Sequence, residues 1–168
     1  MVSVETGQTW REATYSQYAT MSPSSALIAS CSIDHAETFI FKREAMGTPD
    51  HDPIEVSVRG LRPHFSRDET MLATCADTSA FLYDAQAGYQ QVMHANDPLA
   101  CQNMCTSPDM SYDSRLLLSG GMLWDVRNHE RVCLFDRLAP LDQPLAIQLF
   151  HPNRSFCVYL AAFAEPLY

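Results

Sequence analysis

Two short segments bring together residue types that act in hydrolases and metal sites. The segment PHFSRD contains His64, Ser66 and Asp68, the three side-chain types of a hydrolase triad. Triads are assembled from separated parts of a chain, so this clustering indicates a strand end and a turn instead. The segment PDHDP, residues 49–53, places a histidine between two aspartates. It lacks an evident fourth ligand, and its flanking prolines favour an exposed loop, so we expect no metal site there.

The six cysteines do not form a recognisable disulfide or zinc pattern. Cys101 and Cys105 have the spacing C-x3-C, with no second close pair and no matching histidine pair downstream, and Cys133 and Cys157 lie in apolar runs. We expect the cysteines to be small buried hydrophobic residues. The sequence also lacks a phosphate-binding glycine loop and a nucleophile elbow. We therefore predict a protein without cofactors and without catalytic residues.

The segment WDVR, Trp124 to Arg127, has two interpretations. In the structural one, Trp124 packs between sheets, Asp125 binds backbone amides at a strand end, and Arg127 is a solvated turn residue. In the functional one, Arg127 projects from a rim and enters an acidic or carbonyl-lined pocket of a partner protein. A planar guanidinium suits that task because it makes several directional, charge-assisted hydrogen bonds.

The elements around these residues follow a regular pattern. In the segment MLATCADTSAFLYDAQAG, we predict strands over Met71–Cys75 and Ala80–Tyr83. A turn at Asp77 joins the two strands, and Asp84 and Gly88 form the turn after the second. Aspartate and glycine favour such turns because Asp binds backbone amides and Gly accepts a positive φ.

This pattern repeats with a period of about 41 residues, which is typical of WD repeats. The pair Tyr83 and Asp84 is followed 41 residues later by Trp124 and Asp125. Glycines recur at intervals of 40 and 41 residues, at Gly7, Gly47 and Gly88. Turn landmarks that precede apolar runs are spaced by 44, 41 and 44 residues, at Pro23, Arg67, Pro108 and Pro152.

The fold prediction is an all-β, incomplete WD-repeat β-propeller with antiparallel four-stranded blades. No window sustains a helical apolar stripe, whereas short β-runs with turn signals recur along the chain. We place the repeats at approximately 8–47, 48–88 and 89–129, with an incomplete fourth at 130–168. Seven blades of this period would need about 290 residues. We therefore expect open strand edges, through which the chain would self-associate.

The segment from Ser111 to Asn153 departs from a generic WD repeat. Gly120 and Gly121 join two apolar strands through a shortened hairpin, which leads into WDVR and, about 25 residues later, into FHPN. This order resembles the WD-repeat domain of the Vpr-binding protein family, as do FLYDAQAG and NDPLACQN and, more weakly, VETGQ and MSPSSALIAS. The family consists of substrate receptors of cullin-4 RING ubiquitin ligases.

The resemblance implies a non-catalytic module that supports ubiquitination by protein–protein interaction. Trp124, Asp125 and Arg127 would bind the ligase adaptor, itself a propeller protein, and another face would present an unknown protein substrate. The chain lacks the helical region and acidic tail of such receptors, so we expect a fragment or short form. The alternatives are a generic WD-repeat scaffold unrelated to ubiquitin and a hydrolase built on a propeller. A hydrolase would require converging histidine and carboxylate groups at the channel mouth.

Composition excludes some partner classes and favours others. Eleven Lys and Arg residues against twenty Asp and Glu residues give a net charge of −9. This balance disfavours nucleic-acid binding, which requires a clustered basic surface. The first residues lack the basic region and the apolar run of a secretory signal peptide. No apolar run approaches the roughly 20 residues that span a membrane. We expect an intracellular protein, nuclear or cytoplasmic, that binds neither nucleic acid nor membrane.

Overall fold

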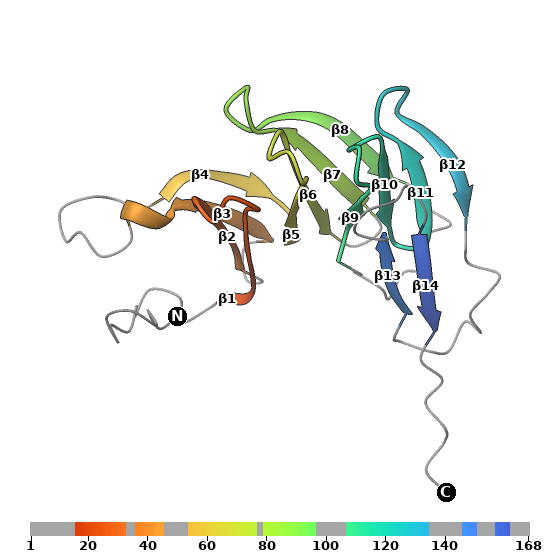
Figure 1. Ribbon diagram of the computed structural model, residues 1–168, viewed down its shortest axis with the longest axis horizontal. Helices are drawn as coiled ribbons and strands as arrows, with labels where there is room; N and C mark the ends of the chain where they lie inside the picture. Colours follow the sequence, from red (N-terminus) through yellow and green to blue (C-terminus); the bar gives the residue numbers. More distant parts are fainter. Residues whose placement is uncertain are drawn as a thin grey trace, which may run out of the picture.

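The computed structural model describes residues 16–32, 36–45, 54–76, 79–96, 107–134, 146–150 and 157–161. These residues are nearly all in β-strands, apart from turns and one short 3-10 helix, η2 (Arg43–Ala45). They form three antiparallel four-stranded sheets and a two-stranded fourth sheet, which follow one another across the molecule (Figure 1). The prediction of an all-β fold built from antiparallel four-stranded blades is confirmed.

Within each sheet the strands are paired in chain order, so every sheet is a simple meander. The first sheet contains β1 (Ser16–Met21), β2 (Leu27–Ser32), β3 (Glu37–Lys42) and β4 (Ile54–Arg59). The second contains β5 (Leu61–Phe65), β6 (Met71–Ala76), β7 (Ser79–Asp84) and β8 (Gln90–Asn96). The third contains β9 (Asp109–Met110), β10 (Leu116–Ser119), β11 (Met122–Asp125) and β12 (Glu130–Leu134). The fourth pairs β13 (Ala146–Phe150) with β14 (Cys157–Ala161).

The first strands of successive sheets are neighbours, as expected around the axis of a propeller. Strand β1 contacts β5, β5 contacts β9, and β9 contacts β13. Sequence repeats and structural sheets are offset by one strand. The predicted repeat 48–88, for example, covers β4 of the first sheet and β5, β6 and β7 of the second.

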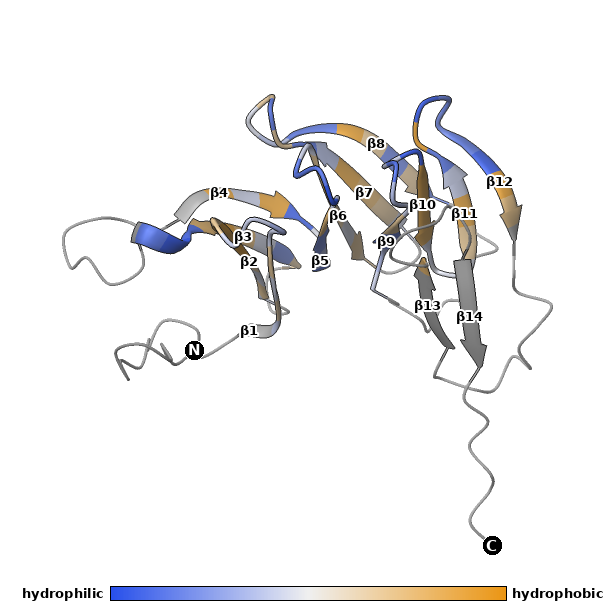
Figure 2. Cartoon of the chain, viewed as in Figure 1, coloured by the Kyte–Doolittle hydropathy of each residue, from blue (hydrophilic) through white to orange (hydrophobic). Residues whose placement is uncertain are grey.

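The core lies between the sheets because the second sheet is apolar on both faces. Phe81 and Tyr83 of β7 pack toward the first sheet, in a cluster with Ala29, Ile40, Val58, Phe65, Leu72 and Ala76. The alternate residues Ala80 and Leu82 pack toward the third sheet, in a cluster with Leu117, Met122, Trp124 and Val126. Figure 2 shows hydrophobic colour over much of β7, β10 and β11 and hydrophilic colour in the turns before β6 and β10.

The turn after the first strand has the same hydrogen bonds in three sheets. A serine amide donates to a carbonyl at the start of the second strand, at 3.0, 2.9 and 2.9 Å for Ser22, Ser66 and Ser111. Each serine hydroxyl accepts the amide of that same second-strand residue, at 3.1, 2.9 and 2.9 Å. The residue three positions later has a positive φ in each turn, at Ser25, Glu69 and Ser114.

These bonds correct one of the sequence landmarks. The equivalent serines are 44 and 45 residues apart, so Tyr112 of the third sheet occupies the place of Arg67 in the second. Pro108, which the sequence analysis aligned with Arg67, lies four residues earlier. The mistake arose because proline was taken as the marker, whereas the hydrogen bonds of the turn are made by serine.

Two negative findings concern the described segments. Among them there is no helix long and apolar enough to cross a bilayer. The same segments contain no group of three or more His, Cys, Asp or Glu side chains placed to hold a metal ion. The PDHDP segment lies outside the described residues.

Candidate interaction rim

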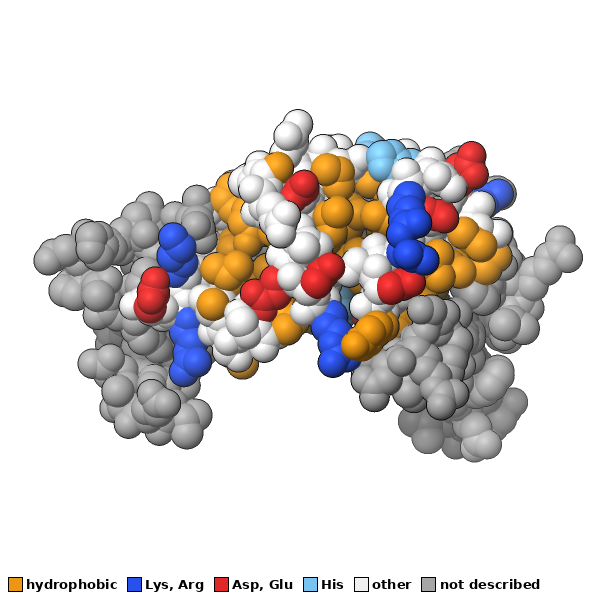
Figure 3. Space-filling view, turned by 45° about the horizontal axis from the view of Figure 1, so that its top comes forward, with side chains coloured by type: hydrophobic (Ala, Val, Ile, Leu, Met, Phe, Trp, Pro, Cys, Tyr) orange, Lys and Arg blue, Asp and Glu red, His pale blue; other side chains and the backbone are white. Residues whose placement is uncertain are grey.

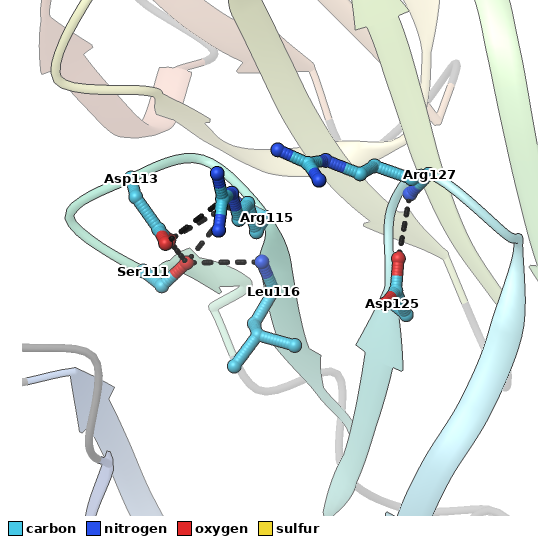
Figure 4. Close-up of polar contacts among 6 residues, drawn as sticks. All are labelled: Ser111, Asp113, Arg115, Leu116, Asp125 and Arg127. Atoms are coloured by element: carbon cyan, nitrogen blue, oxygen red, sulfur yellow. Dashed lines mark hydrogen bonds and ion pairs between the residues drawn. The ribbon is translucent and has the colours of Figure 1, made fainter.

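The WDVR segment ends β11 and forms the turn that follows it. The Asp125 carboxylate accepts hydrogen bonds from the amides of Arg127, at 2.8 Å, and Asn128, at 3.2 Å. These bonds satisfy amides at the strand end and hold the main chain of the turn in one conformation. The Arg127 side chain is exposed and extends away from this capped turn (Figure 4).

Trp124 lies on the other side of the same backbone. Its side chain is 8% exposed and packs in the cluster between the second and third sheets. The indole Nε1 is buried and has no hydrogen-bond partner among the described residues. Of the three residues expected to bind a partner, Trp124 is buried and Asp125 is engaged with backbone amides. Arg127 is therefore the one of the three whose side chain is exposed.

We call the edge formed by the turns after the first and third strands of each sheet the rim. A neighbouring turn places a second arginine on this rim. The Val126 amide donates to the Arg115 carbonyl at 2.9 Å, which ties the turn after β11 to the turn before β10. Arg115 Nε lies 3.6 Å from the Asp113 carboxylate, so its charge is partly compensated. The hydrogen bond from the Ser111 hydroxyl, at 2.7 Å, lowers the pKa of Asp113 and keeps this carboxylate ionised. Figure 4 shows both arginines at the same end of the third sheet, where β10 begins and β11 ends.

Contacts between the turns of different sheets continue along the rim. The Ser24 hydroxyl donates to Glu69 Oε2 at 2.9 Å, and the Ser24 amide donates to Glu69 Oε1. Ser114 Oγ lies 3.3 Å from Asp68 Oδ1. These contacts join the first sheet to the second and the second to the third. Hence Asp68 and Glu69 each have a partner in a neighbouring sheet. Figure 3 shows acidic side chains spread over this face among basic and polar ones.

The turn after β7 repeats the arrangement of the turn after β11. Asp84 Oδ1 accepts the amides of Gln86 and Ala87, at 2.8 and 3.1 Å. Gly88 then adopts a φ of 67°. His129, which is 41 residues further along the chain, adopts a φ of 57° in the corresponding turn.

The shortened hairpin between β10 and β11 consists of two glycines in the left-handed region. Gly120 has a φ of 59° and Gly121 a φ of 81°. Glycine adopts these angles without the steric cost that a Cβ atom would bring. The remaining predicted turn residue, Asp77, lies outside the described residues.

The triad-like segment PHFSRD is a strand end and a turn. The Ser66 hydroxyl donates to Asp68 Oδ1 at 2.7 Å and accepts the amide of Met71. Burial acts to raise the pKa of Asp68, but its hydrogen bonds from Ser66, Thr70 and Ser114 outweigh burial and lower it. Ser66 therefore serves the turn, and His64 points to a different carboxylate.

That carboxylate is Asp109, and sequence analysis did not anticipate the pair. His64 Nε2 lies 3.0 Å from Asp109 Oδ1. Asp109 also accepts the amides of Met110, at 2.9 Å, and Phe150, at 2.6 Å. A histidine and a carboxylate thus do converge on the first strands, as a hydrolase would require. Their described contacts join the second, third and fourth sheets to one another.

The short connection between the first and second sheets contains another residue that sequence analysis missed. Gly60 has a φ of 105°, and a Cβ atom on it would lie 2.3 Å from Thr74 Oγ1. The preceding carbonyl, of Arg59, accepts the hydroxyls of Thr74 and Tyr83, at 2.7 and 2.8 Å. The available signal was a glycine between the alternating segment IEVSVR and the segment LRPHF, because a glycine within β-structure marks close backbone approach.

Two of the three described cysteines fit the prediction of small buried hydrophobic residues. Cys31 and Cys75 are unbridged and buried, at 1% and 2% exposed, and they lie 44 residues apart on equivalent strands. Cys133 is unbridged and half-buried. Cys101 and Cys105 lie outside the described residues, as does the side chain of Cys157.

Comparison with known proteins supports the fold. No protein-family model matches the chain, and no curated protein matches its sequence. Among solved structures, the chain is similar to the β-propeller domain of Cps50 (Swd1) from Myceliophteria thermophila, with a TM-score of 0.64 and 10% sequence identity. The match covers 85% of this chain and 46% of that chain, so this chain spans less than half the length of that structure. The described sheets thus have the fold of β-propeller blades.

Proposed function

We propose that this chain is the adaptor-binding and substrate-presenting module of a cullin-4 RING ubiquitin ligase, bound to the adaptor through Arg127. The observation that carries the proposal is the state of the Arg127 side chain. It is exposed within a capped turn, and within the described part of the chain no carboxylate forms an ion pair with it. The assignment to this ligase class rests on the resemblance of the 111–153 segment, and the propeller fold is compatible with it.

The geometry suits insertion of an arginine into a pocket. The two bonds of Asp125 hold the turn, so ordering the main chain on binding costs little further entropy. The Arg127 guanidinium offers five N–H donors to carbonyl or carboxylate acceptors of a partner. Arg115 lies on the same rim and adds positive charge there, although Asp113 partly compensates it.

The proposal assigns no catalytic step to this chain. A propeller holds variable loops on a common scaffold, and its functions therefore depend on surfaces rather than on the fold. In the proposed complex, ubiquitin transfer is performed by other subunits, and this chain positions the substrate. A generic WD-repeat scaffold would instead leave Arg127 as a solvated turn residue.

The test is the affinity of the adaptor for variants of the 168-residue chain, measured by biolayer interferometry. We expect Arg127→Ala to weaken binding by about 2 kcal/mol or more, the range of an interface hot spot. Arg127→Glu should weaken it further. The free energy of unfolding of both variants should stay within about 0.5 kcal/mol of that of the parent, because the substituted side chain is exposed and away from the core.

A matched control removes an exposed arginine elsewhere. Arg43 lies in η2, the 3-10 helix that follows β3, and is also exposed. Arg43→Ala changes the net charge by the same amount, and we expect it to leave adaptor affinity unchanged. Unchanged affinity for Arg127→Glu, or no binding of the adaptor to the parent chain, would favour the generic scaffold.

A further inference from the structure

Arg62 and Tyr18 form a stacked pair on neighbouring first strands. The Arg62 guanidinium carbon lies 4.5 Å from the centroid of the Tyr18 ring. One of its terminal nitrogens also donates to the Tyr18 hydroxyl at 3.0 Å. Stacking and the hydrogen bond together restrict the orientation of the guanidinium plane. An arginine held in this way is prepared to bind a planar anionic group.

Both residues occupy irregular positions in their strands. In β1 the register shifts between Ser16 and Tyr18, and in β5 it shifts between Leu61 and His64. Arg62 lies within the second irregularity and has a φ of 52°, which is uncommon for a residue other than glycine. Bulges reorient side chains and are frequent beside functional sites. The backbone is thus distorted on both strands where the pair is formed.

The charge of Arg62 is not compensated by the described residues around it. Within the described part of the chain no carboxylate lies within 4 Å of its guanidinium, although acidic residues outnumber basic ones by twenty to eleven. The carboxylate on the neighbouring first strand, Asp109, is engaged by His64 and two backbone amides. Tyr18 is 39% exposed, so solvent reaches the pair.

We propose that Arg62 and Tyr18 bind a carboxylate side chain of an acidic peptide segment. A carboxylate matches the planar fork of the guanidinium and supplies the negative charge that the site lacks. Four of the five guanidinium N–H groups are not used by the Tyr18 hydroxyl and remain for this ligand. The Tyr18 ring forms the apolar side of the site against the peptide stem.

The site lies away from the Arg127 rim. Arg127 follows β11, in the turn that is bonded to the turn after β9. Arg62 is instead the second residue of β5, near the opposite end of a first strand. In Figure 1 the turns that follow β7 and β11 lie at the top, whereas β1 begins at the lower end of the first sheet. Binding at Arg62 therefore requires no contact with the rim, and this inference does not depend on the proposed ligase function.

The experiment is a titration of the full 168-residue chain with two probe peptides, acetyl-AEAEA-amide and acetyl-AQAQA-amide. The readout is the side-chain Nε resonance of Arg62 in nitrogen-15 spectra. We expect the glutamate peptide to shift this resonance and to bind about tenfold or more tightly than the glutamine peptide, because it alone carries a charge. Equal affinity for the two peptides, or binding of neither, would overturn the proposal.

Variants distinguish this site from general attraction to arginine. Arg62→Ala should abolish the preference for the glutamate peptide, measured by calorimetry. Tyr18→Phe keeps the ring and loses the hydroxyl that orients the guanidinium, so we expect a loss of about threefold. Arg67 is the matched control, because its guanidinium also stacks on a tyrosine, Tyr112, at 4.3 Å. Arg67→Ala should leave binding unchanged, and an equal loss in this variant would contradict the assignment to Arg62.

Discussion

The third strands of the second and third sheets end in the same kind of turn. They differ in whether the polar atom of the aromatic residue before that turn has a hydrogen-bond partner. Asp84 and Asp125 each accept two amides of the following turn, at similar distances. Tyr83 donates its hydroxyl to the Arg59 carbonyl, whereas the indole Nε1 of Trp124 has no described partner. The turn is thus determined by the aspartate. The aromatic residue contributes burial, and its polar atom depends on what the neighbouring sheet offers.

Residues with a positive φ also differ in what constrains them: the backbone angle of the turn itself, or in addition the packing of a neighbouring strand. Gly88 and His129 both have a positive φ, at 67° and 57°. Gly88 has no atom within 4 Å of the site where a Cβ would lie, so crowding does not require glycine there. Gly60 is different, because its Cβ would overlap Thr74. A positive φ alone therefore favours glycine without requiring it, whereas a positive φ together with close packing requires it.

The largest expected effect concerns this difference. Gly60→Ala combines an unfavourable φ of 105° with a Cβ only 2.3 Å from Thr74 Oγ1. We expect the free energy of unfolding to fall by about 3 kcal/mol or more, the sum of backbone strain and overpacking. Gly88→Ala is the matched control, in which φ strain alone should cost about 1 kcal/mol. Denaturant titration measures both, and similar losses would show that Thr74 does not constrain Gly60.

A smaller effect tests the aromatic residues themselves. Tyr83→Phe removes the hydroxyl that donates to the Arg59 carbonyl and leaves the ring in the core. We expect a loss of about 1 kcal/mol, the usual contribution of one hydrogen bond, because Thr74 still donates to the same carbonyl. The double variant with Thr74→Val leaves that acceptor without either hydroxyl, and its loss should exceed the sum of the single losses. Additive losses in chemical denaturation would argue against a shared acceptor.

The features that sequence predicted are those determined within a few residues. Strands β6 and β7 followed from short apolar runs between Asp and Gly turn signals. The period near 41 followed because each turn is formed by its own aspartate, at Asp84 and Asp125. Arg127 was expected at the surface for the same reason, since it lies in the turn two residues after the strand end.

The features that sequence missed depend on how neighbouring sheets meet. His64 and Asp109 are 45 residues apart, and Tyr18 and Arg62 are 44 apart. Each pair consists of one residue from each of two first strands, and their contact requires the position of both sheets around the axis. A repeat predicts that first strands adjoin, but a bulge such as that at Arg62 changes which side chains meet.

The smallest expected effect is a stabilisation at His129. This residue holds a φ of 57° without the freedom of glycine, at the position where the second sheet has Gly88. A left-handed conformation costs a residue with a Cβ about 1–2 kcal/mol, and His129→Gly removes that cost. Glycine also gains entropy in the unfolded chain, which offsets about 0.4–1 kcal/mol of the benefit.

We therefore expect a net gain of about 0.5 kcal/mol for His129→Gly, measured as a raised denaturation midpoint at unchanged slope. The control is His129→Ala, which removes the exposed imidazole but retains a Cβ and should leave stability close to that of the parent. A gain of equal size in both variants would indicate that the imidazole, and not the backbone angle, is unfavourable. In that case the turns after β7 and β11 would share their aspartate bonds but not a common requirement for glycine.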